Sequence, residues 1–284
     1  VDRRHVYLIS RVSELTKRVP QDLTIALARL TPKAHQIWAQ SRQSGDVSTF
    51  LPVLSEVVAL TKHKGAALAD GKSLSLYDAL LQEYEPDATS ETISEMFRQL
   101  HGPLLELRAA VLEKPAPPQI SRTFDEAKQI EFAHFLASTF GYDFSRGRID
   151  KAVHPFSSGS SSDVRITTRT DAENPMDCFY STIHEVGHGS YEQNICADYV
   201  FTALGKGCSM GVHESQSRIF ENQLGRSRGF SAFLFDKMKE AFGDFGISDS
   251  ENFYKTVNRV SSGYIRTEAD ELQYNLHIML RYEL

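Results

Sequence analysis

Helical periodicity constrains this chain more than any other sequence feature. Apolar residues recur three or four positions apart in most segments, as they do on the buried face of an α-helix. The pattern therefore predicts a mainly α fold. The helices expected from it span residues 31–43, 48–67, 90–113, 123–141, 175–196, 212–224, 228–242, 250–261 and 264–284.

Local signals define several of the helix ends. Thr31 followed by Pro32 is typical of a helix start, because proline is favoured at the first helical position. Thr123 and Glu126 have the spacing of a capping box, which predicts another start. Gly141 is typical of the end of that helix.

A different pattern occurs in the middle of the chain. Val164–Thr168 has an alternating pattern that is rich in β-branched residues, which predicts a strand. The Ser- and Gly-rich run Ser157–Ser162 predicts a solvated loop. Lys114–Pro118 is a stiff connector. We therefore expect an N-terminal helical region at residues 1–118 and a second region at residues 119–284.

Composition excludes several classes of protein. The 284 residues are 41% hydrophobic and 24% charged, which is enough for a sizeable core and excludes general disorder. A net charge of −6 without a Lys/Arg-rich block argues against nucleic-acid binding, and the apolar runs are far shorter than the roughly 18 residues of a membrane span. Three cysteines without a CxxC pair favour a reducing compartment. We expect a cytoplasmic protein.

Neither end of the sequence carries a terminal signal. The N-terminus lacks an initiator Met and an apolar targeting segment, and the C-terminus stops within a helical pattern. We therefore expect the sequence to be part of a longer protein.

The segment HEVGH at residues 184–188 carries the clearest chemistry. On a helix, His184 and His188 lie on one face with about 5–6 Å between their Cβ atoms, so both imidazoles can reach one metal ion. Glu185 lies beside them, where it can accept a proton from water at the metal. The alternative is two exposed helical histidines.

A third metal ligand is expected from the helical segment that follows the turn-rich stretch 205–211. An adjacent antiparallel helix can place Glu214 beside the two histidines. Two histidines and one carboxylate leave a coordination position open, as in catalytic zinc sites. Zn²⁺ is therefore the expected cofactor, although Co²⁺ or Mn²⁺ can use the same ligands.

Several polar residues near these ligands have alternative interpretations. His213 is a substrate contact, a hydrogen-bond donor behind the metal ligands or a surface histidine. Arg218 and Glu221 either orient Glu214 or form an ordinary ion pair on a solvated face. Arg266 belongs to a polar stripe on the last expected helix, and this stripe is expected to line a cleft. The other members of the stripe are Asp270, Tyr274, His277 and Arg281.

Five short motifs in order make the sequence similar to the carboxypeptidase Taq family of metallocarboxypeptidases. The similarity extends from about Gly147 to the last residue. The motifs are HPF at His154–Phe156, DxRxT at Asp163–Thr167, HEVGH, HES at His213–Ser215 and IRxxAD at Ile265–Asp270.

The resemblance implies a neurolysin-like helical peptidase fold with a small antiparallel sheet beside a deep groove, and a homodimer. It implies a zinc enzyme that releases C-terminal residues from peptides with broad specificity, proline being disfavoured. Glu214 is then the third zinc ligand, Glu185 the general base, and Arg266 the side chain that binds the free C-terminal carboxylate. The HPF and DxRxT segments are expected to close one end of the groove. The remaining substrate-binding residues implied are His154, Asp163, Arg165 and His213.

The sequence departs from the family pattern in two places. Ser261–Tyr264 replaces a stretch that usually reads more like Pro-Ser. The later GxxQ motif and the Tyr-bearing segment that contacts the substrate carbonyl do not occur, so weak activity is expected of this chain alone. Two other functions stay open: an endopeptidase or aminopeptidase on the same metal site, and a helical interaction domain without activity.

Overall fold

The computed structural model describes residues 2–284, which divide into two compact units. The first unit ends at Ser94, and the second spans Glu95–Leu284. The expected division at residue 118 concerns functional regions and stays a prediction. Within the described residues, no helix is both long enough and apolar enough to cross a membrane.

The first unit is helical. α3 packs against α2 and α4, and Gly65 allows α4 to approach, because a Cβ there would lie 3.1 Å from the Leu76 carbonyl oxygen. The helices are α1 (Asp2–Arg18), α2 (Gln21–Ser44), α3 (Leu51–Ala69), α4 (Leu76–Leu81) and the start of α5 (Ser90–Leu112).

The predicted helix start at Pro32 is wrong, because α2 begins at Gln21 and continues through this proline. A proline inside a helix removes one hydrogen bond and costs about 3 kcal/mol. Leu30 and Ala34 on either side of it are buried, so packing of this stretch offsets the local penalty. Local sequence signals alone cannot predict this stabilisation by packing.

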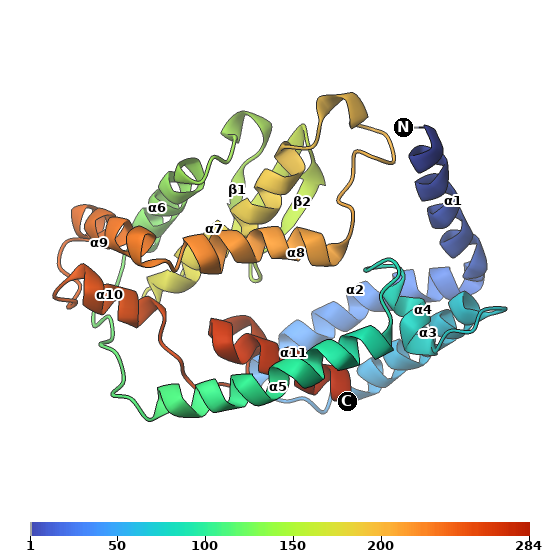
Figure 1. Ribbon diagram of the computed structural model, residues 1–284, viewed down its shortest axis with the longest axis horizontal. Coiled ribbons are helices and arrows are strands. Elements are labelled where there is room, and N and C mark those ends of the chain that lie inside the picture. The colour runs from blue at the N-terminus through green and yellow to red at the C-terminus, as the bar shows by residue number, and fades with distance from the viewer. Residues whose placement is uncertain (1) are drawn as a thin grey trace. The chain divides into compact units, whose positions relative to one another are not determined.

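The second unit is built around α7 (Pro175–Gln193). This helix packs against α6 (Glu126–Thr139), α8 (Met210–Arg218) and strand β3 (Asp163–Thr168). Figure 1 shows α7 next to α8 and the sheet. The other elements are β1 (Ile149–Lys151), β2 (Ser157–Ser160), a π-helical turn (Ile219–Leu224), α9 (Arg228–Phe242), α10 (Ser250–Val257), α11 (Glu271–Glu283) and 3-10 turns at Phe144–Arg146, Ala197–Tyr199 and Arg266–Glu268.

An aromatic core fixes α7 in place. Phe179 of α7 packs against Phe132 of α6, with 4.7 Å between ring centroids, and against Phe242 at the end of α9. Phe253 of α10 is fully buried in the same cluster. A second cluster, which includes Ile166 and Val186, joins the sheet to α7. The buried faces of α7 therefore set the direction of its remaining face.

The small sheet is mixed rather than wholly antiparallel. β3 lies in the centre, pairs in parallel with β1 and pairs in antiparallel with β2. The prediction of a solvated loop at Ser157–Ser162 is wrong over Ser157–Ser160, which is β2. Gly159 has a φ of +105°, and a Cβ there would lie 2.0 Å from the Asp163 carbonyl oxygen. Backbone pairing with β3 therefore forms a strand whose side chains have little β propensity.

Two helix starts differ from their predictions because an aspartate caps the helix. The cap of α6 is Asp125 rather than Thr123, since its Oδ1 accepts the Lys128 N–H at 2.9 Å. Asp270 accepts the N–H groups of Leu272 and Gln273, so α11 begins at Glu271 rather than at residue 264. Arg266 therefore lies in a turn before α11, outside the predicted helical stripe.

Candidate metal centre

The residues in and next to the HEVGH segment of helix α7 lie on two faces of the helix, one buried in the core and one partly exposed. Ile183 and Val186 are fully buried in the two core clusters. His184 and His188 lie on another face, with side chains 18% and 17% exposed. Their ring centroids are 4.9 Å apart. The core contacts of α7 thus turn both imidazoles toward α8.

Glu214 of α8 completes a group of three donors. Its Oε2 lies 3.6 Å from His184 Nε2 and 3.3 Å from His188 Nε2. Two donors bound to one tetrahedral zinc at roughly 2.0–2.1 Å lie about 3.3 Å apart, so the observed separations fit that ion closely. Among the described residues, this is the one group of three or more His, Cys, Asp or Glu side chains able to hold a metal.

Gly187 sets the distance between α7 and α8. A Cβ at this position would lie 2.5 Å from Ser217 Cα and 3.1 Å from the Gln216 carbonyl oxygen. These are backbone atoms, which cannot rotate away. Since Gly187 lies between the two histidines and Ser217 lies one turn after Glu214, the close approach brings Glu214 to the histidine pair.

A half-buried carboxylate, that of Glu221, holds the outer nitrogen of His184. Glu221 Oε2 lies 2.9 Å from His184 Nδ1 and 3.2 Å from Arg218 Nη1, and its Oε1 lies 3.3 Å from Arg226 Nη2. Burial opposes ionisation of Glu221, but these partners lower its pKa to about 2. The ionised carboxylate can accept a hydrogen bond from the Nδ1–H of His184, which leaves the lone pair on His184 Nε2 free for a metal.

The outer nitrogen of His188 faces another histidine. His188 Nδ1 lies 2.6 Å from His213 Nδ1, and His213 Nε2 lies 3.0 Å from Glu192 Oε1. The Tyr191 ring packs at a tilt against His213, with ring centroids 4.7 Å apart. Both candidate histidine ligands thus have a defined partner on the side away from Glu214.

Glu185 is 6% exposed, and its Oε2 has no hydrogen-bond partner among the described residues. Burial raises the pKa of Glu185 to about 7, with His184 opposing the shift and Glu214 adding to it. An unpartnered buried carboxylate oxygen costs free energy unless water or a ligand reaches it. The position therefore suits a group that exchanges a proton with a bound molecule.

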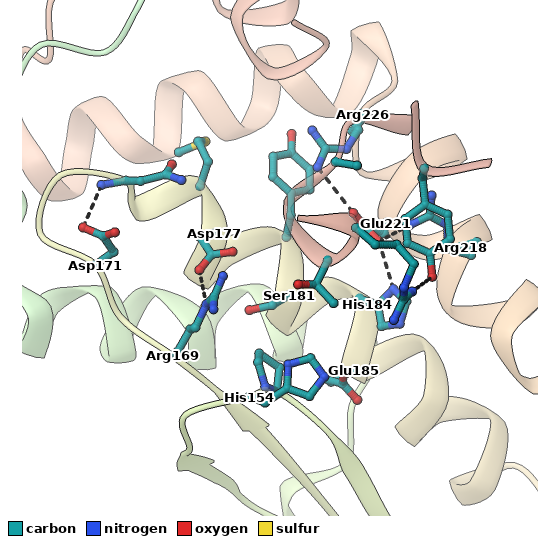
Figure 2. Close-up of a pocket in the computed structure, with 18 of the residues that line it drawn as sticks. His154, Arg169, Asp171, Asp177, Ser181, His184, Glu185, Arg218, Glu221 and Arg226 are labelled. Atoms are coloured by element: carbon teal, nitrogen blue, oxygen red, sulfur yellow. Dashed lines mark hydrogen bonds and ion pairs between the residues drawn. The ribbon is translucent and has the colours of Figure 1, made fainter. Parts of the chain in front are cut away.

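A cavity of about 740 Å³ is lined by two of the three donors, His184 and Glu214, and by Glu185. Figure 2 shows the Arg169–Asp177 ion pair in one part of it and the His184–Glu221 pair in another. Ser181, one turn before the metal-binding segment, also lines it. The walls come from α7, the segment after β3, α8 with the π-helical turn, and the turn before α11.

A family model described as carboxypeptidase Taq (M32) metallopeptidase matches residues 2–284. The chain belongs to this family.

Individual members of the carboxypeptidase Taq family agree with this assignment. Thermostable carboxypeptidase 1 of Thermus thermophilus is 38% identical over 95% of the chain, and carboxypeptidase 1 of Bacillus subtilis is 36% identical over 99%. The crystal structure of an M32 carboxypeptidase from Deinococcus radiodurans covers 99% of the chain at 35% identity, with a TM-score of 0.89. The chain spans 55%, 57% and 57% of these three proteins, or little more than half of their length.

Two of the substrate-binding residues implied by the carboxypeptidase Taq resemblance line the cavity, namely His154 and Arg266. Arg266 donates from Nη1 to the Tyr274 hydroxyl, and Arg218 lies over the same ring at 4.2 Å from its centroid. Arg266 and Tyr274 are therefore brought together although they do not share a helix.

The other three implied residues do not line this cavity. Asp163 and Arg165 lie on the exposed side of β3 and pair with each other, with Arg165 Nη2 2.8 Å from Asp163 Oδ2. Alternation along the strand explains this position, because Val164 and Ile166 face the core. His213 faces His188 and Glu192 instead. A substrate-binding role for these three residues stays a prediction.

Some of the residues around the carboxypeptidase Taq site have no role in the predictions made from the sequence. Glu192 follows His188 by four positions, and this helical spacing is a signal that could have been used. Arg226 follows Glu221 by five positions, a spacing that an ordinary α-helix does not bring together, so the sequence offers no such signal for it. Arg169 and Asp177 likewise meet across a strand end and a helix start.

Proposed function

We propose that this chain forms the metal site of a metallocarboxypeptidase, which hydrolyses the last peptide bond of a peptide. The observation that carries the proposal is the convergence of His184, His188 and Glu214 beside a 740 Å³ cavity. Membership of the carboxypeptidase Taq family supports the same activity. Because the chain spans little more than half of its relatives' length, the activity and substrates of the whole protein are part of the proposal.

The donor set fits a divalent cation. Two imidazoles and one carboxylate suit Zn²⁺, and Co²⁺ or Mn²⁺ can take the same ligands. A cation held there supplies Lewis acidity, which polarises a carbonyl oxygen and acidifies water. The cavity beside Glu214 leaves room for substrate and water at this group.

Glu185 is proposed as the general base. Its unpartnered oxygen and its pKa of about 7 support a role in which it accepts a proton from the attacking water. It then returns that proton to the amine nitrogen as the peptide bond breaks. Each turnover leaves the side chain in its starting state.

Arg266 is proposed to bind the C-terminal carboxylate of the substrate. Apart from Nη1, its guanidinium nitrogens have no acceptor among the described residues, whereas Arg218 and Arg226 are bound to Glu221. A guanidinium binds a carboxylate with two parallel hydrogen bonds. We further propose broad specificity that disfavours proline, with His154, Asp163 and Arg165 as further substrate contacts. We also propose a cytoplasmic homodimer. The family resemblance supports these points.

The test compares Glu185→Gln with the unchanged chain. The variant should retain zinc after dialysis but lose hydrolysis of a free-acid peptide by about 10²–10⁴-fold, because it cannot accept the proton. Unchanged hydrolysis would contradict the assignment. A peptide with an amidated C-terminus should be cleaved far more slowly than its free-acid form, and equal rates would indicate an endopeptidase.

A further inference from the structure

We propose that His213 and Glu192 are positioning residues, which hold the metal ligand His188 through a hydrogen-bonded chain from His188 Nδ1 through the His213 ring to the Glu192 carboxylate. This inference rests on the proposed metal site. It differs from a substrate-contact role for His213, because both ring nitrogens already have partners within the protein.

The chain of contacts fixes where each proton lies. His188 directs Nε2 toward Glu214 at 3.3 Å, so that nitrogen is the one available to a metal and carries no proton when it binds. The proton of the neutral ring is then on Nδ1, which donates to His213 Nδ1 at 2.6 Å. His213 must carry its own proton on Nε2, which donates to Glu192 Oε1 at 3.0 Å.

The opposite direction does not permit metal binding. If His213 Nδ1 were the donor, His188 Nδ1 would have to be the acceptor and could carry no proton. The proton of a neutral His188 would then lie on Nε2, the nitrogen that faces Glu214. This direction would also leave the unprotonated Nε2 of a neutral His213 against the Glu192 carboxylate, so that two acceptors would meet. One arrangement of protons therefore satisfies every contact and keeps His188 Nε2 open.

The surroundings of His213 limit the movement of its ring. The Tyr191 ring packs against one side in a tilted arrangement, with 4.7 Å between centroids. A Cβ on Gly207 would lie 2.9 Å from His213 Cδ2, so the loop before α8 leaves no room for a side chain between it and the ring. The Glu192 side chain is largely buried, with 14% of it exposed. A ring held in this way can determine the orientation of its neighbour.

The arrangement at His188 matches the one at His184. Glu221 accepts directly from His184 Nδ1, whereas Glu192 acts on His188 through one intervening imidazole. Outer hydrogen-bond partners of this kind fix ligand orientation and raise ligand basicity, and their loss typically weakens metal binding about 10–100-fold. Removing His213 should therefore weaken zinc binding.

The experiment measures zinc affinity of the full chain by competition with a chromophoric chelator. His213→Phe keeps a ring beside Tyr191 but removes both nitrogens, and it should weaken zinc binding about 10–100-fold. His213→Asn places an amide oxygen near the former Nδ1 position and should recover most of the loss. The control is His134→Phe, which changes a histidine stacked on Phe144 outside the site and should leave affinity unchanged.

A long-range proton–nitrogen spectrum of the zinc-loaded chain supplies a second readout. His188 should be protonated at Nδ1, with a downfield proton signal that His213→Phe abolishes. Where His213→Phe does not fold, Glu192→Gln serves instead: it keeps an acceptor but loses the charge, so a smaller loss of affinity and a shifted His213 Nε2 proton signal are expected.

The possible results separate this inference from the proposed function. If a folded His213→Phe variant binds zinc as tightly as the wild-type chain, the positioning role is overturned and the metal site is left intact. An Asn variant as weak as the Phe variant would also overturn it, as would unchanged affinity and spectrum in Glu192→Gln. A wild-type chain that binds no zinc would overturn both proposals.

Discussion

The replacement Gly187→Ala tests how the metal group is assembled. Its new Cβ would lie 2.5 Å from Ser217 Cα, whereas ordinary contacts begin at 3.4 Å, so α8 must move away by about 0.9 Å. Overpacking of this kind typically costs about 1–3 kcal/mol. For a domain of this size each kcal/mol lowers the melting temperature by about 2–4 °C. The same movement takes Glu214 away from the histidines.

Thermal melting and zinc competition measure the two effects. Gly187→Ala should melt about 2–12 °C lower and bind zinc at least about 10-fold more weakly, comparable to the loss of an outer partner. The matched control is Gly229→Ala on α9, where an added Cβ meets nothing within 4 Å. It should bind zinc normally and melt at an equal or higher temperature, since alanine favours helix. A Gly187→Ala variant that matches the unchanged chain in both measurements would refute the reasoning.

Three other predictions concern the helix cap, the outer carboxylate and the thiols. Asp270→Ala should lower the free energy of unfolding in urea by about 0.5–2 kcal/mol, because α11 loses its cap; an unchanged midpoint would contradict this. Glu221→Gln should weaken zinc binding about 10–100-fold in chelator competition, and equal affinity would argue against its role. Burial raises the pKa of the Cys178 thiol from 9.0 to about 11. The contribution of the buried neutral thiol to the free energy of unfolding is therefore fully present below pH 9 and is lost as the pH rises toward 11. At pH 8 a chromogenic disulfide should react with the exposed Cys196 and Cys208 before unfolding and with Cys178 only afterwards, whereas three equally fast thiols would contradict the buried position.

The sequence predicted most of the helices because their signals are local. The expected helix at residues 228–242 coincides with α9, whose apolar spacing and Ser227 cap lie within one short stretch. The metal-binding group was also predictable in outline. Four-residue spacing places His184 and His188 together on any helix, and Glu214 lies in the next long helical segment.

The remaining features depend on contacts between distant segments. Ser157–Ser160 becomes a strand through pairing with β3, and its side chains give no indication of this. Arg169 pairs with Asp177 only because the segment after β3 lies beside the start of α7. The approach of Gly187 to Ser217 is likewise a property of two packed helices. Periodicity within one segment cannot predict such distances.

The most direct test of the metal centre is a crystal structure of the zinc-soaked chain with anomalous data at the zinc edge. One anomalous peak should lie between α7 and α8, bonded to His184 Nε2, His188 Nε2 and Glu214 Oε2 at about 2.0–2.2 Å. A peak elsewhere, or a zinc at the histidines with Glu214 turned away, would contradict the account.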